Sequence, residues 1–258
     1  MLSVKVSTMV YLKHAYNQVL NGNPVINFLK SKEENIEIDL SDIKGTYAIS
    51  SYENINKISK RIQNEKEELV YILGSGNFHY LNLALSKDIN EPFNLFVFDH
   101  HVDAYPFYAE HVSCGSWIDD LIKNNPNLKH VFILACSKEQ TEYDFNHKDM
   151  FSFLIDRDYS LGLLQTYLNK LSLKDAYISI DCDVFAESIL LTNWDQGIID
   201  LETALQSISL IKANTKLIKA DICGGLEWDF HNFQAINNKK YFRQEVNVYQ
   251  ALLTALEA

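Results

Sequence analysis

The chain has 258 residues, a formal net charge of −11 and 47% hydrophobic residues. This length and composition are typical of one soluble α/β domain, so we expect a single domain over residues 1–258. The acidic balance argues against a nucleic-acid or anionic membrane partner, which would call for a basic patch. The chain has no run of ~18 apolar residues that could span a membrane, and its start lacks a signal-peptide pattern, so we predict a cytoplasmic protein.

Apolar runs and amphipathic stretches alternate along the chain. In the first 60 residues, short strands are predicted at residues 9–12 and 46–50, and the acidic segment 31–42 is predicted to be a surface loop. Strands buried on both faces are predicted at residues 69–73, 94–98, 176–180 and 216–222. Amphipathic helices are predicted at residues 116–123, 161–170, 201–212 and 245–256. This alternation indicates a parallel sheet.

Three of the predicted strands are followed at once by side chains that bind metals. The six candidate ligands are His79, Asp99, His101, Asp103, Asp181 and Asp183. Open parallel sheets bind ligands at the edge where such strands end. Carboxylates with a minority of imidazoles suit an ion such as Mn²⁺ better than a structural zinc. Six ligands exceed the need of one open catalytic ion, so we predict two ions roughly 3.5–4 Å apart that share bridging carboxylates.

The order and composition of these clusters resemble a known family. Asp99-His100-His101-Val102-Asp103 is similar to the Asp-Ala-His-x-Asp motif of the arginase/agmatinase (ureohydrolase) family, with His100 in the alanine position. Ser179-Ile180-Asp181-Cys182-Asp183 resembles its Ser-x-Asp-x-Asp motif, and residues 74–79 resemble a lengthened Gly-Gly-x-His segment. The resemblance implies a three-layer α/β/α fold with a mostly parallel sheet and two Mn²⁺ ions, with other divalent metals as substitutes.

The same resemblance implies how the ligands divide. His79, Asp99, Asp103 and Asp181 would hold one ion, His101 and Asp183 the other, and Asp99 and Asp181 would bridge them. The implied activity is hydrolysis of a non-peptide linear C–N bond, in which a hydroxide between two cations attacks an sp² carbon. Asp103 therefore counts among the catalytic residues as well as the ligands.

Two further residues are candidates for catalytic roles. His111 is predicted to shuttle protons, because an imidazole near neutral pKa can protonate a departing amine. The alternative for His111 is a solvated loop histidine. Glu227 is the second candidate, since Gly224 and Gly225 allow unusual backbone angles that could bring its carboxylate to the site.

The motifs also depart from the family pattern. After the strand at residues 216–222 the family carries a glutamate that pairs with the substrate guanidinium, whereas here Cys223-Gly224-Gly225 follows. Without a facing carboxylate, a guanidinium taken out of water is poorly recognised. This difference moves the expected substrate toward a neutral amide, amidine or formimino group. Asp195 and Gln196 are predicted either to contact substrate or to form a turn.

Three functional interpretations stay open. The leading one is a binuclear-metal hydrolase acting on a guanidino, formimino or amide-type substrate. The second is a non-catalytic, metal-containing protein of the arginase fold that binds a small ligand, and the third is a metal-dependent deacetylase of amines. The expected partner is a small nitrogenous molecule, and the aromatic residues within 105–108 could supply either a pocket wall or an interface in a homo-oligomer.

The four cysteines show no CxxC pairing and lie in or near apolar strands. They are Cys114, Cys136, Cys182 and Cys223. This distribution fits reduced, structural thiols in a cytosolic protein better than a disulfide framework.

Overall fold

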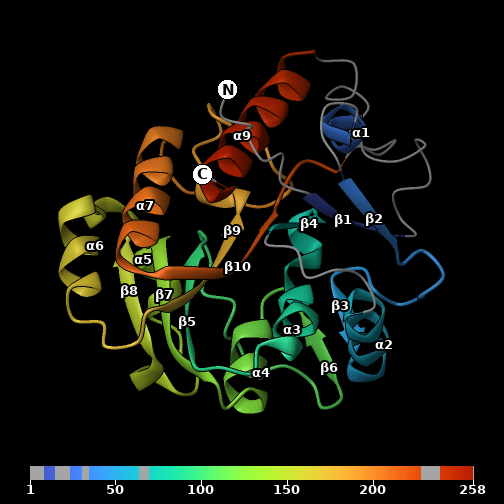
Figure 1. The fold of residues 1–258 in the computed structure, drawn as a ribbon, viewed down its shortest axis with the longest axis horizontal. Coiled ribbons are helices and arrows are strands. Elements are labelled where there is room, and N and C mark those ends of the chain that lie inside the picture. Colours follow the sequence, from blue (N-terminus) through green and yellow to red (C-terminus); the bar gives the residue numbers. More distant parts are fainter. Residues whose placement is uncertain (1–8, 15–23, 31–34, 64–69, 228–238, 258) are drawn as a thin grey trace, which may run out of the picture.

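The computed structural model describes residues 9–14, 24–30, 35–63, 70–227 and 239–257 (Figure 1). An eight-stranded sheet has the strand order β2-β1-β4-β10-β9-β5-β7-β8, and every neighbouring pair is parallel. In that order the strands are Asn35–Asp39, Met9–Lys13, Val70–Gly74, Lys216–Cys223, Asp175–Asp181, Phe93–Phe98, Leu128–Cys136 and Phe151–Ile155. A separate antiparallel pair joins β3 (Ile49–Ser51) to β6 (His111–Ser113).

Helices cover both faces of the large sheet. The α-helices are α1 Pro24–Lys30, α2 Tyr52–Gln63, α3 Asn82–Leu85, α4 Trp117–Asn124, α5 Lys138–Thr141, α6 Leu161–Leu168, α7 Leu201–Asn214 and α9 Lys239–Glu257. Short 3₁₀ helices include η2 Gly76–Leu81 and η6 Cys182–Val184, which follow β4 and β9. Figure 1 places α7 and α9 on one side of the sheet and α2, α3 and α4 on the other.

The buried core has two parts, one on each face of the sheet. Because side chains alternate along a strand, Phe96 packs with residues of α6, α7 and α9, whereas its neighbour Val97 packs with residues of α2, α3 and α4. All six residues of β5 are buried, as expected for a central strand of a parallel sheet covered on both faces. The predicted three-layer α/β/α architecture is therefore confirmed.

The predicted central strands and helices agree with the structure to within a few residues, except that α9 begins six residues before the predicted helix. The prediction of a surface loop at residues 31–42 is wrong for residues 35–39. These residues form edge strand β2, which pairs in parallel with β1. The strand predicted at 46–50 is shorter and shifted to 49–51. Within the described residues, no helix is long and apolar enough to cross a bilayer.

Candidate metal centre

All six predicted ligands lie at or after the ends of β4, β9 and β5, with β10 lying between β4 and β9 and Phe98 at the end of β5 opposite Ile180 of β9. Strand register makes the carboxyl ends level, since Asp181 at the end of β9 lies opposite Cys223 at the end of β10, and Cys223 lies opposite Gly74 of β4. The three motifs identified in the sequence thus meet at one edge of the sheet, as an open parallel topology requires. Five of the six ligands are at most 7% exposed, and the sixth, His101, is partly buried.

The His79 imidazole faces three carboxylates. Its Nδ1 lies 3.0 Å from Asp103 Oδ2, 3.3 Å from Asp99 Oδ2 and 3.4 Å from Asp181 Oδ2. Asp103 adopts a φ of +51°, a left-handed conformation that aspartate tolerates better than most residues, and its Oδ2 accepts a 2.9 Å hydrogen bond from Trp117 Nε1. These four side chains are the set that the sequence resemblance assigned to one ion.

The second imidazole, His101, faces the other side of the cluster. Its Nδ1 lies 3.0 Å from Asp183 Oδ2 and 3.4 Å from Asp99 Oδ1, so Asp99 presents one oxygen to each histidine. Its Nε2 lies 3.2 Å from Asp195 Oδ1. A carboxylate on the outer nitrogen of a ligating histidine fixes the ring orientation in many metal sites. Asp195 therefore supports His101, whereas the side chain of Gln196 bonds to loop main chain and builds the turn.

A buried hydrogen-bond chain fixes the tautomer of His79. Its Nε2 lies 2.9 Å from Ser179 Oγ, and Ser179 donates its own hydrogen to Asp221 Oδ1 at 3.1 Å. Asn82 Nδ2 also donates to Ser179 Oγ, and Tyr177 donates to Asn82 Oδ1. Because the Ser179 oxygen can accept a hydrogen bond from the ring, Nε2 carries a hydrogen, and Nδ1 of the neutral ring would turn its lone pair toward the carboxylates.

The electrostatics of the cluster favour a bound cation. Burial, together with the neighbouring Asp181 and Asp99, raises the pKa of Asp183 well above its usual range. Burial and Asp99 also raise the pKa of Asp103 to about 6. His79 Nδ1 and Asp99 Oδ2 are buried and lie 3.3 Å apart, and neither makes a hydrogen bond with the residues that the structure describes. Crowded carboxylates, with a buried imidazole lone pair aimed among them, are a donor set that suits two divalent ions.

A cavity of about 240 Å³ opens onto the cluster. Its lining consists of Gly76, His101, Asp103, Tyr105, Cys114, Gly115, Gln140, Asp181, Asp183 and Trp194. The Tyr105 hydroxyl donates a hydrogen bond to Gln140 Oε1, which leaves the Gln140 amide hydrogens as the donors on that wall. Sequence reasoning missed Gln140, because it lies on α5 after a strand that carried no motif.

The end of β10 differs from the ends of the ligand-bearing strands. Gly224 has a φ of +87°, and a Cβ at this position would lie 2.0 Å from Asp181 Oδ1. No side chain can therefore occupy position 224 in this conformation, and the absence of the glutamate expected from the family pattern is built into the backbone.

Glu227 is not among the described residues that line the cavity, and it bonds to Ser75 and Asn77, which flank the lining residue Gly76. Its Oε1 accepts hydrogen bonds from Ser75 Oγ at 2.8 Å and Asn77 Nδ2 at 2.6 Å, and its Oε2 accepts one from Tyr47 at 2.9 Å. These bonds tie the loop after β10 to the loop after β4. The observed contacts fit a loop anchor, and a catalytic role for Glu227 stays a prediction.

The structure does not bring His111 to the cluster. This residue lies on β6, is exposed, and has its Nδ1 3.3 Å from the carbonyl oxygen of Ala109. It is not among the described residues that line the 240 Å³ cavity. The predicted proton-shuttle role gains no support from this position.

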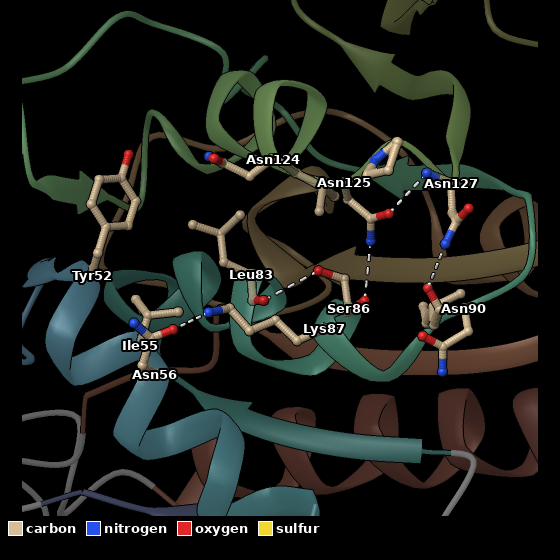
Figure 2. Close-up of a pocket in the computed structure, with 13 residues that line it drawn as sticks. Tyr52, Ile55, Asn56, Leu83, Ser86, Lys87, Asn90, Asn124, Asn125 and Asn127 are labelled. Carbon is tan, nitrogen blue, oxygen red and sulfur yellow. Dashed lines mark hydrogen bonds between the residues drawn. The ribbon is translucent and has the colours of Figure 1, made fainter.

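A larger cavity lies elsewhere and has a different character. It has a volume of about 510 Å³ between α2, α3, α4 and the loop before β7, and Figure 2 shows its asparagine-rich lining. Asn125 and Asn127 use their amides to bond the main-chain oxygens of Ser86 and Ile89, so they stabilise the surrounding turns. None of the six candidate ligands lines it. Volume alone therefore does not identify the functional site.

Comparisons with known proteins place this arrangement in context. No family model matches the chain. An uncharacterized protein of Thermotoga maritima is 34% identical over 155 residues, which is 60% of this chain and 57% of that relative's length.

Solved structures give a fold likeness over nearly the whole chain. Formiminoglutamase of Trypanosoma cruzi, solved with Mn²⁺, superposes with a TM-score of 0.69 at 12% identity and covers 97% of this chain and 93% of its own. A hypothetical agmatinase of Burkholderia thailandensis has a TM-score of 0.66 at 15% identity (98% and 86% covered), and arginase of Medicago truncatula has 0.64 at 14% (98% and 86%). The chain therefore has the arginase-like fold.

Proposed function

We propose that this chain is a binuclear-metal hydrolase of the ureohydrolase type, which cleaves a linear C–N bond other than a peptide bond. The observation that carries the proposal is the cluster of six candidate ligands, in which His79 Nδ1 and Asp99 Oδ2 are buried and make no hydrogen bond with the described residues. The arginase-like fold, shared with a formiminoglutamase solved with Mn²⁺, supports manganese as the first metal to test.

The ligands would divide as their contacts suggest. His79, Asp103 and Asp181 would hold one ion, His101 and Asp183 would hold the other, and Asp99, which lies beside both histidines, would be shared, with Asp181 as the second shared ligand predicted from sequence. When bound, two such ions supply a water that is deprotonated near neutral pH and polarise the bond to be cleaved. Tyr105 and Trp194 would wall the substrate in, and Asp195 would hold the His101 ring in place.

The lining of the cavity favours an uncharged substrate group. Apart from the candidate metal ligands, its described lining contains no carboxylate, and Gly224 has no side chain to contribute one. A guanidinium taken from water into this cavity would lack the anion that compensates its desolvation. The described lining contains no lysine or arginine either, so a carboxylate on the substrate would find no cationic side chain. We therefore favour a small amide or formamide group over a guanidino group.

The Gln140 amide gives this neutral group a partner. Because Tyr105 donates to Oε1 of Gln140, the Nε2 hydrogens are the polar groups left to meet a substrate oxygen. A substrate carbonyl held there would be oriented by a hydrogen bond that a guanidinium, which is only a donor, cannot make.

A substrate panel with defined metal content tests the proposal. Chelated protein is reloaded with Mn²⁺, Co²⁺ or Zn²⁺, and is given formamides, other primary and secondary amides, formimino compounds, guanidino compounds and N-acetylated amines. We expect turnover of an uncharged amide-type compound that stops on chelation. Fully metal-loaded protein that turns over none of the panel, but melts at higher temperature with one compound, would support a binding protein instead. Acetate as the main product would support a deacetylase.

A further inference from the structure

The ligand cluster extends to a residue that has no place in the two ligand sets above. Cys223 ends β10 opposite Asp181, and its Sγ lies 3.2 Å from Asp181 Oδ2. The same oxygen lies 3.4 Å from His79 Nδ1. His79, Asp181 and Cys223 are all buried, and each offers a ligand atom within 4.8 Å of the others.

We propose that Cys223 binds, as a thiolate, the ion held by His79 and Asp181. The inference rests on the proposed metal site but not on the hydrolysis of any substrate. Ligand atoms in neighbouring positions on one ion, with bonds of about 2.0–2.3 Å, lie about 2.8–3.8 Å apart across octahedral to tetrahedral angles. The separations from Asp181 Oδ2, which are 3.2 Å to Cys223 Sγ and 3.4 Å to His79 Nδ1, fall in this range, and all three ligand atoms lie within 4.8 Å of one another.

A second, independent observation aims at the same point. The Ser179 hydrogen bond turns the His79 Nδ1 lone pair toward the carboxylates, and that atom is buried without a hydrogen-bond partner. An ion bound to His79 Nδ1 would satisfy this nitrogen, and Cys223 Sγ lies beside the Asp181 oxygen that would share that ion, at 3.2 Å.

The other cysteines lack this placement. Cys182 and Cys136 are buried, and Cys114 lines the cavity, but none belongs to a ligand group among the described residues. Ligation by Cys223 would be a proton exchange: the Sγ–H bond breaks, the metal–sulfur bond forms, and the proton leaves for solvent. A soft thiolate beside oxygen donors moves the preference of this ion away from Mn²⁺ toward Zn²⁺, Co²⁺ or Fe²⁺.

Cobalt reports this bond directly. Apo protein is titrated with Co²⁺ while ion content is measured, and the near-ultraviolet spectrum is recorded for the wild type, Cys223→Ser, Cys223→Ala and the matched control Cys114→Ser. We expect a thiolate-to-cobalt charge-transfer band in the wild type and in Cys114→Ser, and no such band in either Cys223 variant. When Zn²⁺ and Mn²⁺ compete for the site, the ratio of Zn²⁺ affinity to Mn²⁺ affinity should be about tenfold higher in the wild type than in Cys223→Ser.

The outcomes separate this inference from the proposed function. Bound Co²⁺ without the band, or with a band unchanged in Cys223→Ala, overturns the thiolate ligand and leaves the hydrolase proposal standing. If neither Co²⁺ nor Mn²⁺ binds the wild type, the metal site fails and both proposals fail with it. Circular dichroism and melting temperature verify that each variant is folded.

Discussion

Strands β9 and β10 run side by side and end at the same site, yet their ends differ in chemistry. β9 ends in Asp181 and leads to Asp183, whereas β10 ends in Cys223 and Gly224. The β9 end supplies carboxylates suited to metal ions, whereas a Cβ at Gly224, after β10, would clash with Asp181 Oδ1. Carboxylates suited to a metal ion can therefore be present at this sheet edge without a carboxylate at position 224 to pair with a cationic substrate.

The largest effect should come from adding a side chain at Gly224, directly after β10. In Gly224→Ala the new Cβ meets Asp181 Oδ1, and a left-handed φ adds roughly 1–2 kcal/mol of strain. We expect loss of at least one bound ion and a fall in activity of about 10²-fold or more, measured by elemental analysis and turnover. The control Gly162→Ala, on α6 with nothing within 4 Å of its Cβ, should be neutral or stabilising by up to about 1 kcal/mol. Full metal content in Gly224→Ala would show that the ends of β9 and β10 leave room for a side chain at position 224.

The carboxylates of the cluster should make stability depend on pH when metal is removed. Burial raises the pKa of Asp103 and of Asp221 from 3.8 to about 6. The folded state then holds protons that the unfolded state releases, so these groups stabilise the fold below pH about 4 and lose that contribution as pH rises to about 6. In chelator, the melting temperature should fall as the pH is raised over this range. The fall should be smaller in Asp103→Asn, and adding Mn²⁺ should reverse it. A melting temperature in chelator that rises from pH 4 to 6 would contradict this expectation.

The fold and the clustering of the six candidate ligands could be predicted from the sequence because their signals are local. A buried run followed at once by Asp181 and Asp183 places both carboxylates at a strand end, whatever the rest of the chain does. The hydrogen bond from Ser179 to Asp221 depends on the register of two strands far apart in sequence, and the contact of Gln140 with Tyr105 depends on how a loop returns to the cavity. No periodicity in the sequence encodes either contact.

A moderate effect is expected at Gln140. Gln140→Leu keeps a similar volume but removes the amide donors, so KM for a neutral amide substrate should rise about tenfold while metal content is unchanged, since a lost hydrogen bond costs about 1.5 kcal/mol. Steady-state kinetics provide the measurement. Gln140→Glu should weaken amide binding and improve inhibition by guanidinium ions. An unchanged KM in both variants would remove Gln140 from substrate recognition.

The smallest effect is expected at His111, which lies exposed on β6. His111→Ala should change kcat by less than about twofold and leave its pH profile unmoved, because a general acid must reach the departing group within hydrogen-bond distance. A loss of 10²-fold, with the basic or acidic limb of the profile removed, would restore the proton-shuttle role predicted from sequence.

The most direct test of the account counts ions per chain. Protein purified with Mn²⁺ is analysed for metal as wild type, as Asp183→Ala and as Asp144→Ala, the last being a fully exposed carboxylate at the surface. Two ions per chain in the wild type and in Asp144→Ala, with fewer in Asp183→Ala, is the predicted result. One ion or none in the wild type, after reloading with Mn²⁺, Co²⁺ or Zn²⁺, would contradict the binuclear centre.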